Sequence, residues 1–362
     1  MAERSHVDHP KVMVISEEDP LKGSVDNLPR PDTDVGFRTL CLESASHLSF
    51  TRLNFPQGFH HWIYVSESCD GLFCIYSVKT QSIYVVNPAT RWLRRLPPYR
   101  CQVLLSNVNN ALEDGRSYER SETYLAFVKA PTGYKLVWLY NNNSSDDSSQ
   151  TVTKCEVFDF EANAWRYLTC TPSYGIFRNQ TPASANGSLY WFTEPYDSEI
   201  QVVAFDINTE TFRLLPKLVS SIASSDPQYV DMCTLDNGMC MSKREGDTMI
   251  QEIWRLKPSQ DSWEKMYTID LLSCSSSSSR TKFRDEFDWG WKDLVEPFTP
   301  PKRVRATRIN ISSNNNKILL SHRYTRSLVK YDSRTKSLSC FYKHRLCTRR
   351  YVPYFQSLIS YI

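Results

Sequence analysis

The sequence predicts an all-β chain folded as a β-propeller of five to seven blades. Three observations predict it: a turn motif that recurs five times, short apolar runs of strand composition ahead of the motif, and the scarcity of amphipathic helix patterns. One small sheet cannot cover its own apolar faces, whereas sheets stacked around an axis bury them. The repeats therefore favour a closed ring over a fold organised around one active-site loop.

The turn motif is a turn-forming stretch followed, six and nine residues later, by apolar side chains. NPATRWLRRLP from Asn87 aligns without a gap with DINTETFRLLP from Asp206. The other copies are DFEANAWRYL from Asp159, KPSQDSWEKM from Lys257 and DSRTKSLSCF from Asp332. The three middle copies are spaced by about 50 residues, which is the size of one four-stranded blade of the kelch type.

A second element precedes the motif: Asp-Gly or Asn-Gly followed by an apolar run such as LFCIYS or LYWF. Glycine after Asp or Asn supplies the positive φ of a tight hairpin turn. The runs are short and rich in β-branched and aromatic residues, as strands are. The three copies begin at Asp70-Gly71, Asn186-Gly187 and Asn237-Gly238.

Three parts of the chain are expected to be irregular. The polar tracts NNNSSDDSSQ (141–150) and CSSSSSR (274–280) are predicted to be mobile loops inside the wider intervals. Residues 1–38 are predicted to be an irregular arm, with order beginning near Phe37 and the propeller domain spanning 39–362. The C-terminal YFQSLISYI (354–362) alternates as a closing strand paired with the first blade would.

Composition narrows the class of protein. The N-terminus lacks the apolar stretch of a secretory signal, and no segment reaches the length of a membrane span. We therefore expect an intracellular protein, in the cytoplasm, the nucleus or both, without membrane contact. The eleven cysteines never form a C-x2-C pair and are expected to be reduced thiols.

The motifs DGLFCIY, IYVVNPATRWLRRLP, NGSLYWFTEP, VVAFDINTETFRLLP and IWRLKPSQDSWEKMYTID together resemble the F-box-associated domain of plant F-box proteins. The resemblance runs from about Thr39 to the C-terminus. It implies a propeller-like domain behind an F-box, which docks on the adaptor of an SCF-type cullin–RING ubiquitin ligase while the propeller selects the protein to be ubiquitinated. The implied partners are a protein substrate and, through an F-box, the adaptor and cullin.

The sequence departs from that family pattern at its N-terminus. An F-box is a helical module of about forty to fifty residues that opens on Leu-Pro. Residues 1–38 contain Leu28-Pro29, but PRPDTDVGF follows and disfavours a helix. No F-box is recognisable in residues 1–38, so two forms stay open: a ligase receptor, or a stand-alone binding protein with no ligase link.

A propeller enzyme is the alternative from another class. The seven histidines show no metal-ligand spacing, and His60 and His61 would point to opposite faces of a strand. The cluster DEFDWGW (285–291) is the one candidate for a glycosidase-like carboxylate pair, although a packed turn or a recognition loop explains it better. We predict no catalytic residue, no metal site and no cofactor.

A basic stretch near the C-terminus is the candidate binding site. Between Lys302 and Arg350 there are 14 Lys and Arg residues against one acidic residue. A solvated blade face would explain the stretch; among functional alternatives, an acidic protein partner is favoured over nucleic acid. The residues predicted to contact such a partner are Lys302, Arg303, Arg305, Arg308, Arg323 and Arg326. The aromatic residues Trp165, Phe212 and Trp263, by contrast, are predicted to pack between blades, because they recur at one position of the motif.

Overall fold

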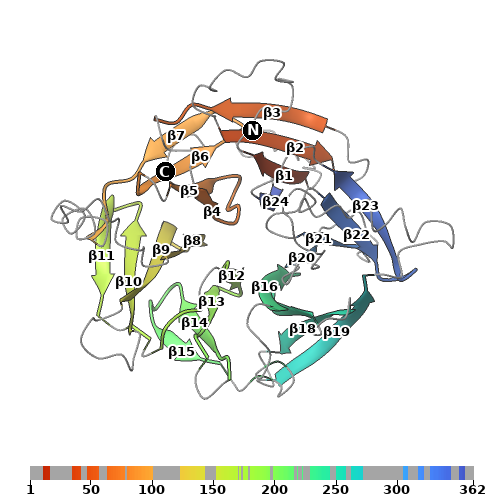
Figure 1. Cartoon of the computed structure of the whole chain (residues 1–362). Coiled ribbons are helices and arrows are strands. Elements are labelled where there is room, and N and C mark those ends of the chain that lie inside the picture. The colour runs from red at the N-terminus through yellow and green to blue at the C-terminus, as the bar shows by residue number, and fades with distance from the viewer. Residues whose placement is uncertain are drawn as a thin grey trace, which may run out of the picture.

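Six four-stranded antiparallel sheets surround a central axis in this computed structural model (Figure 1). From the axis outwards, blade 1 comprises β24 (Arg350–Tyr354), β1 (Lys11–Ser16), β2 (Val35–Cys41) and β3 (His47–Leu53), and blade 2 comprises β4 (Ile63–Val65), β5 (Phe73–Ser77), β6 (Ser82–Asn87) and β7 (Trp92–Arg95). Blade 3 comprises β8 (Thr123–Ala130), β9 (Gly133–Asn142), β10 (Val152–Asp159) and β11 (Ala164–Leu168), and blade 4 comprises β12 (Ala183–Ala185), β13 (Ser188–Phe192), β14 (Val202–Asp206) and β15 (Phe212–Leu214). Blade 5 comprises β16 (Val230–Leu235), β17 (Gly238–Arg244), β18 (Ile250–Lys257) and β19 (Ser262–Asp270), and blade 6 comprises β20 (Arg305–Arg308), β21 (Lys317–Ser321), β22 (Ser327–Asp332) and β23 (Ser337–Lys343). The fold is the predicted all-β propeller, with six blades.

The structure describes residues 11–16, 35–41, 47–56, 63–77, 80–100, 123–142, 152–169, 171–172, 174–177, 180–195, 199–215, 218, 222, 229–244, 250–257, 262–271, 305–308, 317–321, 327–343 and 350–354. The two polar tracts, at 141–150 and 274–280, fall almost wholly outside this part of the chain.

The apolar runs of the sequence form strands that are buried on both faces. In β13, Leu189 and Trp191 pack in the interface with blade 3, whereas Tyr190 and Phe192 pack in the interface with blade 5. Successive side chains of a strand point to opposite faces, so a strand covered on both sides needs apolar residues at every position. This requirement explains why the middle strands read as continuous apolar runs.

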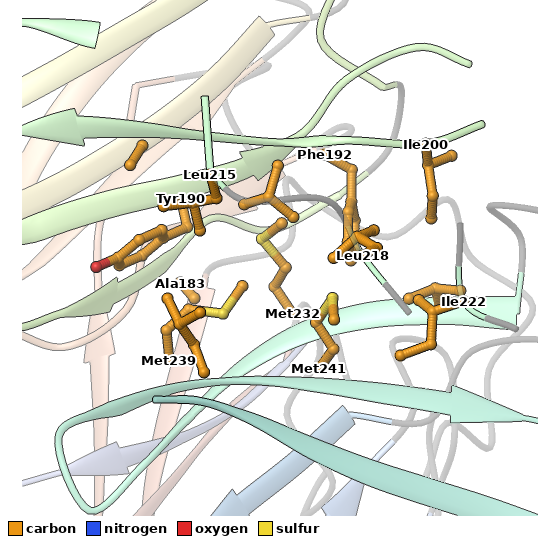
Figure 2. Packing of buried hydrophobic residues seen from close by; sticks show 14 of the residues in the cluster. Ala183, Tyr190, Phe192, Ile200, Leu215, Leu218, Ile222, Met232, Met239 and Met241 are labelled. Atoms are coloured by element: carbon orange, nitrogen blue, oxygen red, sulfur yellow. The ribbon is translucent and has the colours of Figure 1, made fainter. Parts of the chain in front are cut away.

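The hydrophobic core is divided into six clusters, one at each interface between neighbouring blades. The cluster between blades 4 and 5 is rich in methionine: Met232, Met239 and Met241 of blade 5 lie against Tyr190 and Phe192 of blade 4 (Figure 2). Flexible methionine side chains fill irregular space between two twisted sheets. Each blade is therefore stabilised only together with its two neighbours.

The apolar positions of the turn motif alternate between two interfaces. Trp165, Phe212 and Trp263, at position +6, pack against the clusters shared with the preceding blade, as predicted. Leu96 and Leu215, at position +9, belong to the clusters shared with the following blade. The two positions are three residues apart, an odd number, which places them on opposite faces of the fourth strand.

The two ends of the chain meet in blade 1, and here two predictions need correction. Residues 1–38 are not irregular throughout, because Lys11–Ser16 forms β1 between β24 and β2. The ring is closed by a C-terminal strand paired with the first blade, but that strand is Arg350–Tyr354; residues 355–362 lie outside the described part of the chain. β1 escaped notice because six residues without a neighbouring copy of the motif give no repeat signal.

Candidate binding surface

The ring has two ends that differ in their connections. Neighbouring strands of a blade run antiparallel, so the first-to-second and third-to-fourth turns lie at one end, which we call the turn end. The second-to-third connections and those between blades lie at the other, which we call the loop end. The longest connections, residues 96–122 and 271–304, begin and finish at the loop end.

Short, repeated hydrogen-bonded turns build the turn end. Asp206 Oδ1 accepts hydrogen bonds from the backbone N–H groups of Asn208 (2.9 Å) and Thr209 (2.8 Å). Asp159 and Asp332 accept the equivalent pairs of bonds, and Asn87 accepts one. Four residues after each of these, the chain adopts a positive φ, at Arg91, Asn163, Glu210 and Lys336. The turn-forming stretch of the motif is thus a side-chain-capped turn that ends in the left-handed region.

The predicted Asp-Gly and Asn-Gly turns are present, with one change of register. Asp70-Gly71 and Asn186-Gly187 have positive φ at both residues, as a two-residue hairpin requires. In blade 5 the positive φ values belong to Asp236 and Asn237, and Gly238 is already in β17. A Cβ at Gly238 would lie 2.6 Å from Nε of Arg255, so the Arg255 side chain would have to shift to admit it.

Polar contacts join the blades near the turn end. The Arg166 guanidinium of blade 3 forms a bidentate pair with Glu210 of blade 4, at 2.7 and 2.9 Å. The ammonium of the largely buried Lys135 donates to the same carboxylate at 2.8 Å and to the Ile207 carbonyl at 3.0 Å. Hydrogen bonds from Arg166 and then Lys135 outweigh burial and lower the pKa of Glu210.

A second contact of this kind joins blades 2 and 3. Asp70 Oδ2 accepts hydrogen bonds from Lys129 Nζ (2.7 Å) and the Tyr134 hydroxyl (2.8 Å). Burial opposes ionisation, but these two bonds outweigh it and lower the pKa of Asp70. Burial raises the pKa of the neighbouring Cys69 to about 12, so this thiol is not a nucleophile near neutral pH.

None of these groups shows the electrostatics of an acid or base catalyst. The described carboxylates with a shifted pKa are Asp70, Asp206, Glu210 and Glu252, and each shift is downward. A general acid needs the opposite shift. In the described ranges, no three His, Cys, Asp or Glu residues are grouped as a metal site. The clusters His60-His61 and DEFDWGW lie outside those ranges.

The predicted basic site is only partly described. Arg305 and Arg308 lie at the two ends of β20, the strand of blade 6 nearest the axis, paired with Ser321 and Ile318. Lys302 and Arg303 belong to the connection 271–304, and Arg323 and Arg326 to the connection 322–326. These four lie outside the described residues, and both connections belong to the loop end. Contact of the six residues with an acidic partner stays a prediction.

One feature at the loop end was not predicted: a strap of residues 96–100 leaves blade 2 and lies on blade 3. The Pro97 carbonyl accepts a hydrogen bond from Trp165 Nε1 at 2.8 Å. The Tyr99 ring, fully buried, contacts the rings of Trp138 (4.5 Å between centroids) and Trp165 (5.7 Å). The contacts of the strap with Trp138 and Trp165 of blade 3 join residues far apart in sequence, so no local pattern predicted them.

Six blades, six inter-blade clusters and two unlike ends define the chain as a six-bladed β-propeller. Residues 40–360 match the family model described as the F-box associated beta propeller domain. In Arabidopsis thaliana, a putative F-box protein is 64% identical over 362 residues, which is 100% of this chain and 76% of that protein. A putative F-box/kelch-repeat protein of the same plant is 62% identical over 366 residues, covering 100% of this chain and 80% of the relative.

The chain belongs to the plant F-box protein family, through its F-box associated β-propeller domain. A third relative, another putative F-box/kelch-repeat protein of Arabidopsis thaliana, is 56% identical over 337 residues, or 91% of this chain and 74% of the relative. The matched residues begin at Leu40, so β1 of blade 1 lies ahead of them. Among the described residues, no helix is both long and apolar enough to cross a membrane.

Proposed function

We propose that this chain is a non-enzymatic protein-binding domain that selects the target of an SCF-type ubiquitin ligase. Membership of the F-box protein family is the observation that carries the proposal. The mechanism is positioning: connections of the loop end hold a target, and an F-box brings the ligase adaptor and cullin to it. The protein performs no chemistry on the target, which agrees with the downward pKa shifts of the described carboxylates.

The different connections at the two ends of the ring support binding at the loop end. The turn end is made of short turns whose side chains cap their own backbones, such as Asp206 and Asp159. The loop end carries connections of many lengths, and in repeat architectures such variable connections carry specificity. Contacts from the predicted basic residues of connections 271–304 and 322–326 would favour targets with acidic side chains.

A stand-alone binding protein is the second candidate, and the N-terminal strands of the propeller are compatible with it. β1 and β2, at Lys11–Ser16 and Val35–Cys41, are built into blade 1. An F-box of about forty to fifty residues therefore has no room in residues 11–41. In this form the chain holds a partner, and any ligase contact comes from another segment or another protein.

A pull-down with the purified ligase adaptor tests the proposal, with a known F-box protein as the positive control. A matched arm uses this chain fused behind the F-box of that control protein. We expect proteins that co-purify with the chain to lose abundance, in a proteasome-dependent way, in plant cells that express the fusion. Co-purifying proteins whose ubiquitination is unchanged by the fusion would contradict the ligase role. Recovery of the adaptor with the chain alone would exclude the stand-alone form.

A further inference from the structure

The strap of residues 96–100 ends at Arg100, whose backbone N–H is held by a buried glutamate of blade 3. The Arg100 N–H donates to Glu156 Oε2 at 2.9 Å. Glu156 is 1% exposed, and its other oxygen accepts a hydrogen bond from the Tyr140 hydroxyl at 3.0 Å. Together with the buried Tyr99, these hydrogen bonds fix the position of the Arg100 backbone at the surface of the protein.

The Arg100 side chain lies over an exposed aromatic ring of blade 3. Its guanidinium carbon is 5.4 Å from the ring centroid of Tyr167. Tyr167 is the register partner of Glu156 on the neighbouring strand, so both side chains are on the face of the sheet that looks toward blade 2. Tyr167 is one of three large hydrophobic side chains that the described residues expose, at 37%. The pair therefore lies at the rim between blades 2 and 3, toward the loop end.

The charge of Arg100 is not used inside the described part of the protein. No ion pair joins its guanidinium to a carboxylate among those residues. The nearby arginines differ, because Arg94 donates to Asn163 (2.7 Å), Arg95 to Ser82 (3.3 Å) and Arg166 to Glu210. Among these four arginines, Arg100 is the one whose guanidinium donates no hydrogen bond to another described residue.

A guanidinium held over a ring is restricted in position before an anion binds. A cation–π contact does not use the N–H donors, which match the two oxygens of a carboxylate. The orientation lowers the conformational entropy lost on binding. Arginine and tyrosine are also the residues that most often dominate protein interfaces.

We propose that Arg100 and Tyr167 form a recognition site for an aspartate or glutamate side chain in an acidic segment of a protein target. This inference rests on the proposed binding function and names the chemistry of one contact. A protein is favoured over nucleic acid because nucleic-acid binding needs several unpaired cations along a stripe. Here the nearby Arg94 and Arg95 donate hydrogen bonds to Asn163 and Ser82, so Arg100 is not part of a row of arginines with free donors.

Selection from a random 12-residue peptide library on the intact chain tests the site without knowledge of the target. We expect the selected peptides to be enriched in Asp and Glu, and to bind Arg100→Gln about tenfold more weakly, the loss of one charged contact of about 1.4 kcal/mol. Tyr167→Leu should weaken binding several-fold, because the guanidinium loses its contact with the ring. Tyr167→Phe keeps the ring and should bind as the parent does.

The matched control is Arg213→Gln, which removes an exposed arginine from the fourth strand of blade 4. We expect this variant to bind the selected peptides like the parent, which separates a site from a general effect of charge. Thermal unfolding of every variant checks that the fold is retained. If Arg100→Gln alone were unstable, the comparison of Tyr167→Leu with Tyr167→Phe would still decide, because both keep the arginine.

Three results would overturn the inference. The first is a selected set with no acidic enrichment, and the second is equal binding of the set to the parent and to Arg100→Gln. The third is loss in Arg100→Gln of binding to a 12-nucleotide single-stranded RNA in the absence of acidic enrichment, which would assign the site to nucleic acid. The selection uses no ligase component, so its outcome is independent of the adaptor pull-down.

Discussion

Met13 and Val352 are register partners on β1 and β24, although they come from opposite ends of the chain. Both side chains are buried, at 1% and 0% exposure, in the cluster between blades 1 and 2. Their pairing joins the N-terminal and C-terminal segments in one sheet. Ring closure therefore depends on six residues that precede the family match.

We expect Met13→Ala to lower the free energy of unfolding by about 2–5 kcal/mol, because it removes a buried side chain from the closing sheet. Leu48→Ala is the control from the same blade, since Leu48 is 51% exposed and should change stability by less than about 0.5 kcal/mol. Urea titration followed by tryptophan fluorescence measures both. Equal stability of the two variants would mean that β1 does not contribute to closure.

Gly187→Ala should be destabilising by about 1 kcal/mol although nothing lies within 4 Å of the added Cβ. The cost is conformational, because Gly187 has a φ of 72°. Gly187→Asn should cost less, since Asn237 holds the matching position of the blade 5 hairpin at a φ of 54°. Thermal unfolding of the two variants tests the order, and a larger cost for Asn than for Ala would contradict it.

Asp206→Ala should lower the free energy of unfolding by about 1–2 kcal/mol, because two backbone N–H groups lose their acceptor. Asp206→Asn keeps an acceptor oxygen and should retain most of the stability, as Asn87 does in the equivalent turn. Chemical denaturation of both variants gives the comparison. If Asn cost as much as Ala, the charge and not the turn would be responsible.

The ion pairs of Glu210 predict a pH dependence. Its pKa is lowered from 4.5 by Arg166 and Lys135, so its stabilisation is complete above that value and is lost as the pH falls below it. We expect Glu210→Gln to lower the free energy of unfolding by about 1–3 kcal/mol at pH 7, because Lys135 and Arg166 lose their carboxylate.

The difference between the parent and Glu210→Gln should shrink as the pH falls below 4.5 and through the lowered pKa of the parent carboxylate. Denaturant unfolding at pH 7, 4.5 and 3 follows it. A difference that stays constant over this range would show that the effect of the substitution is not the loss of the ionised group. Glu264→Gln, a fourth-strand glutamate paired with Lys257 at an exposed site, is the control and should change stability little.

The sequence by itself determined the local structure of a single blade, namely its turns and its strands. The copies of the turn motif at Asn87, Asp159, Asp206 and Asp332 each carry a capping side chain and a left-handed residue. The strands beside them read as continuous apolar runs, so the unit can be recognised locally. Recurrence of that unit was enough to predict a propeller with Trp165, Phe212 and Trp263 between blades. Local chemistry sufficed because each hairpin is closed by residues that are neighbours in the chain.

Only the tertiary structure decided how the ring closes and which residues surround Arg100. β1 has no motif of its own and is a strand because β2 and β24 lie on its two sides. Arg100 looks like any other arginine in WLRRLPPYR until Glu156 and Tyr167, more than fifty residues later, are brought beneath it. Contacts across such separations are produced by the stacking of blades, and sequence patterns within one blade carry no information about them.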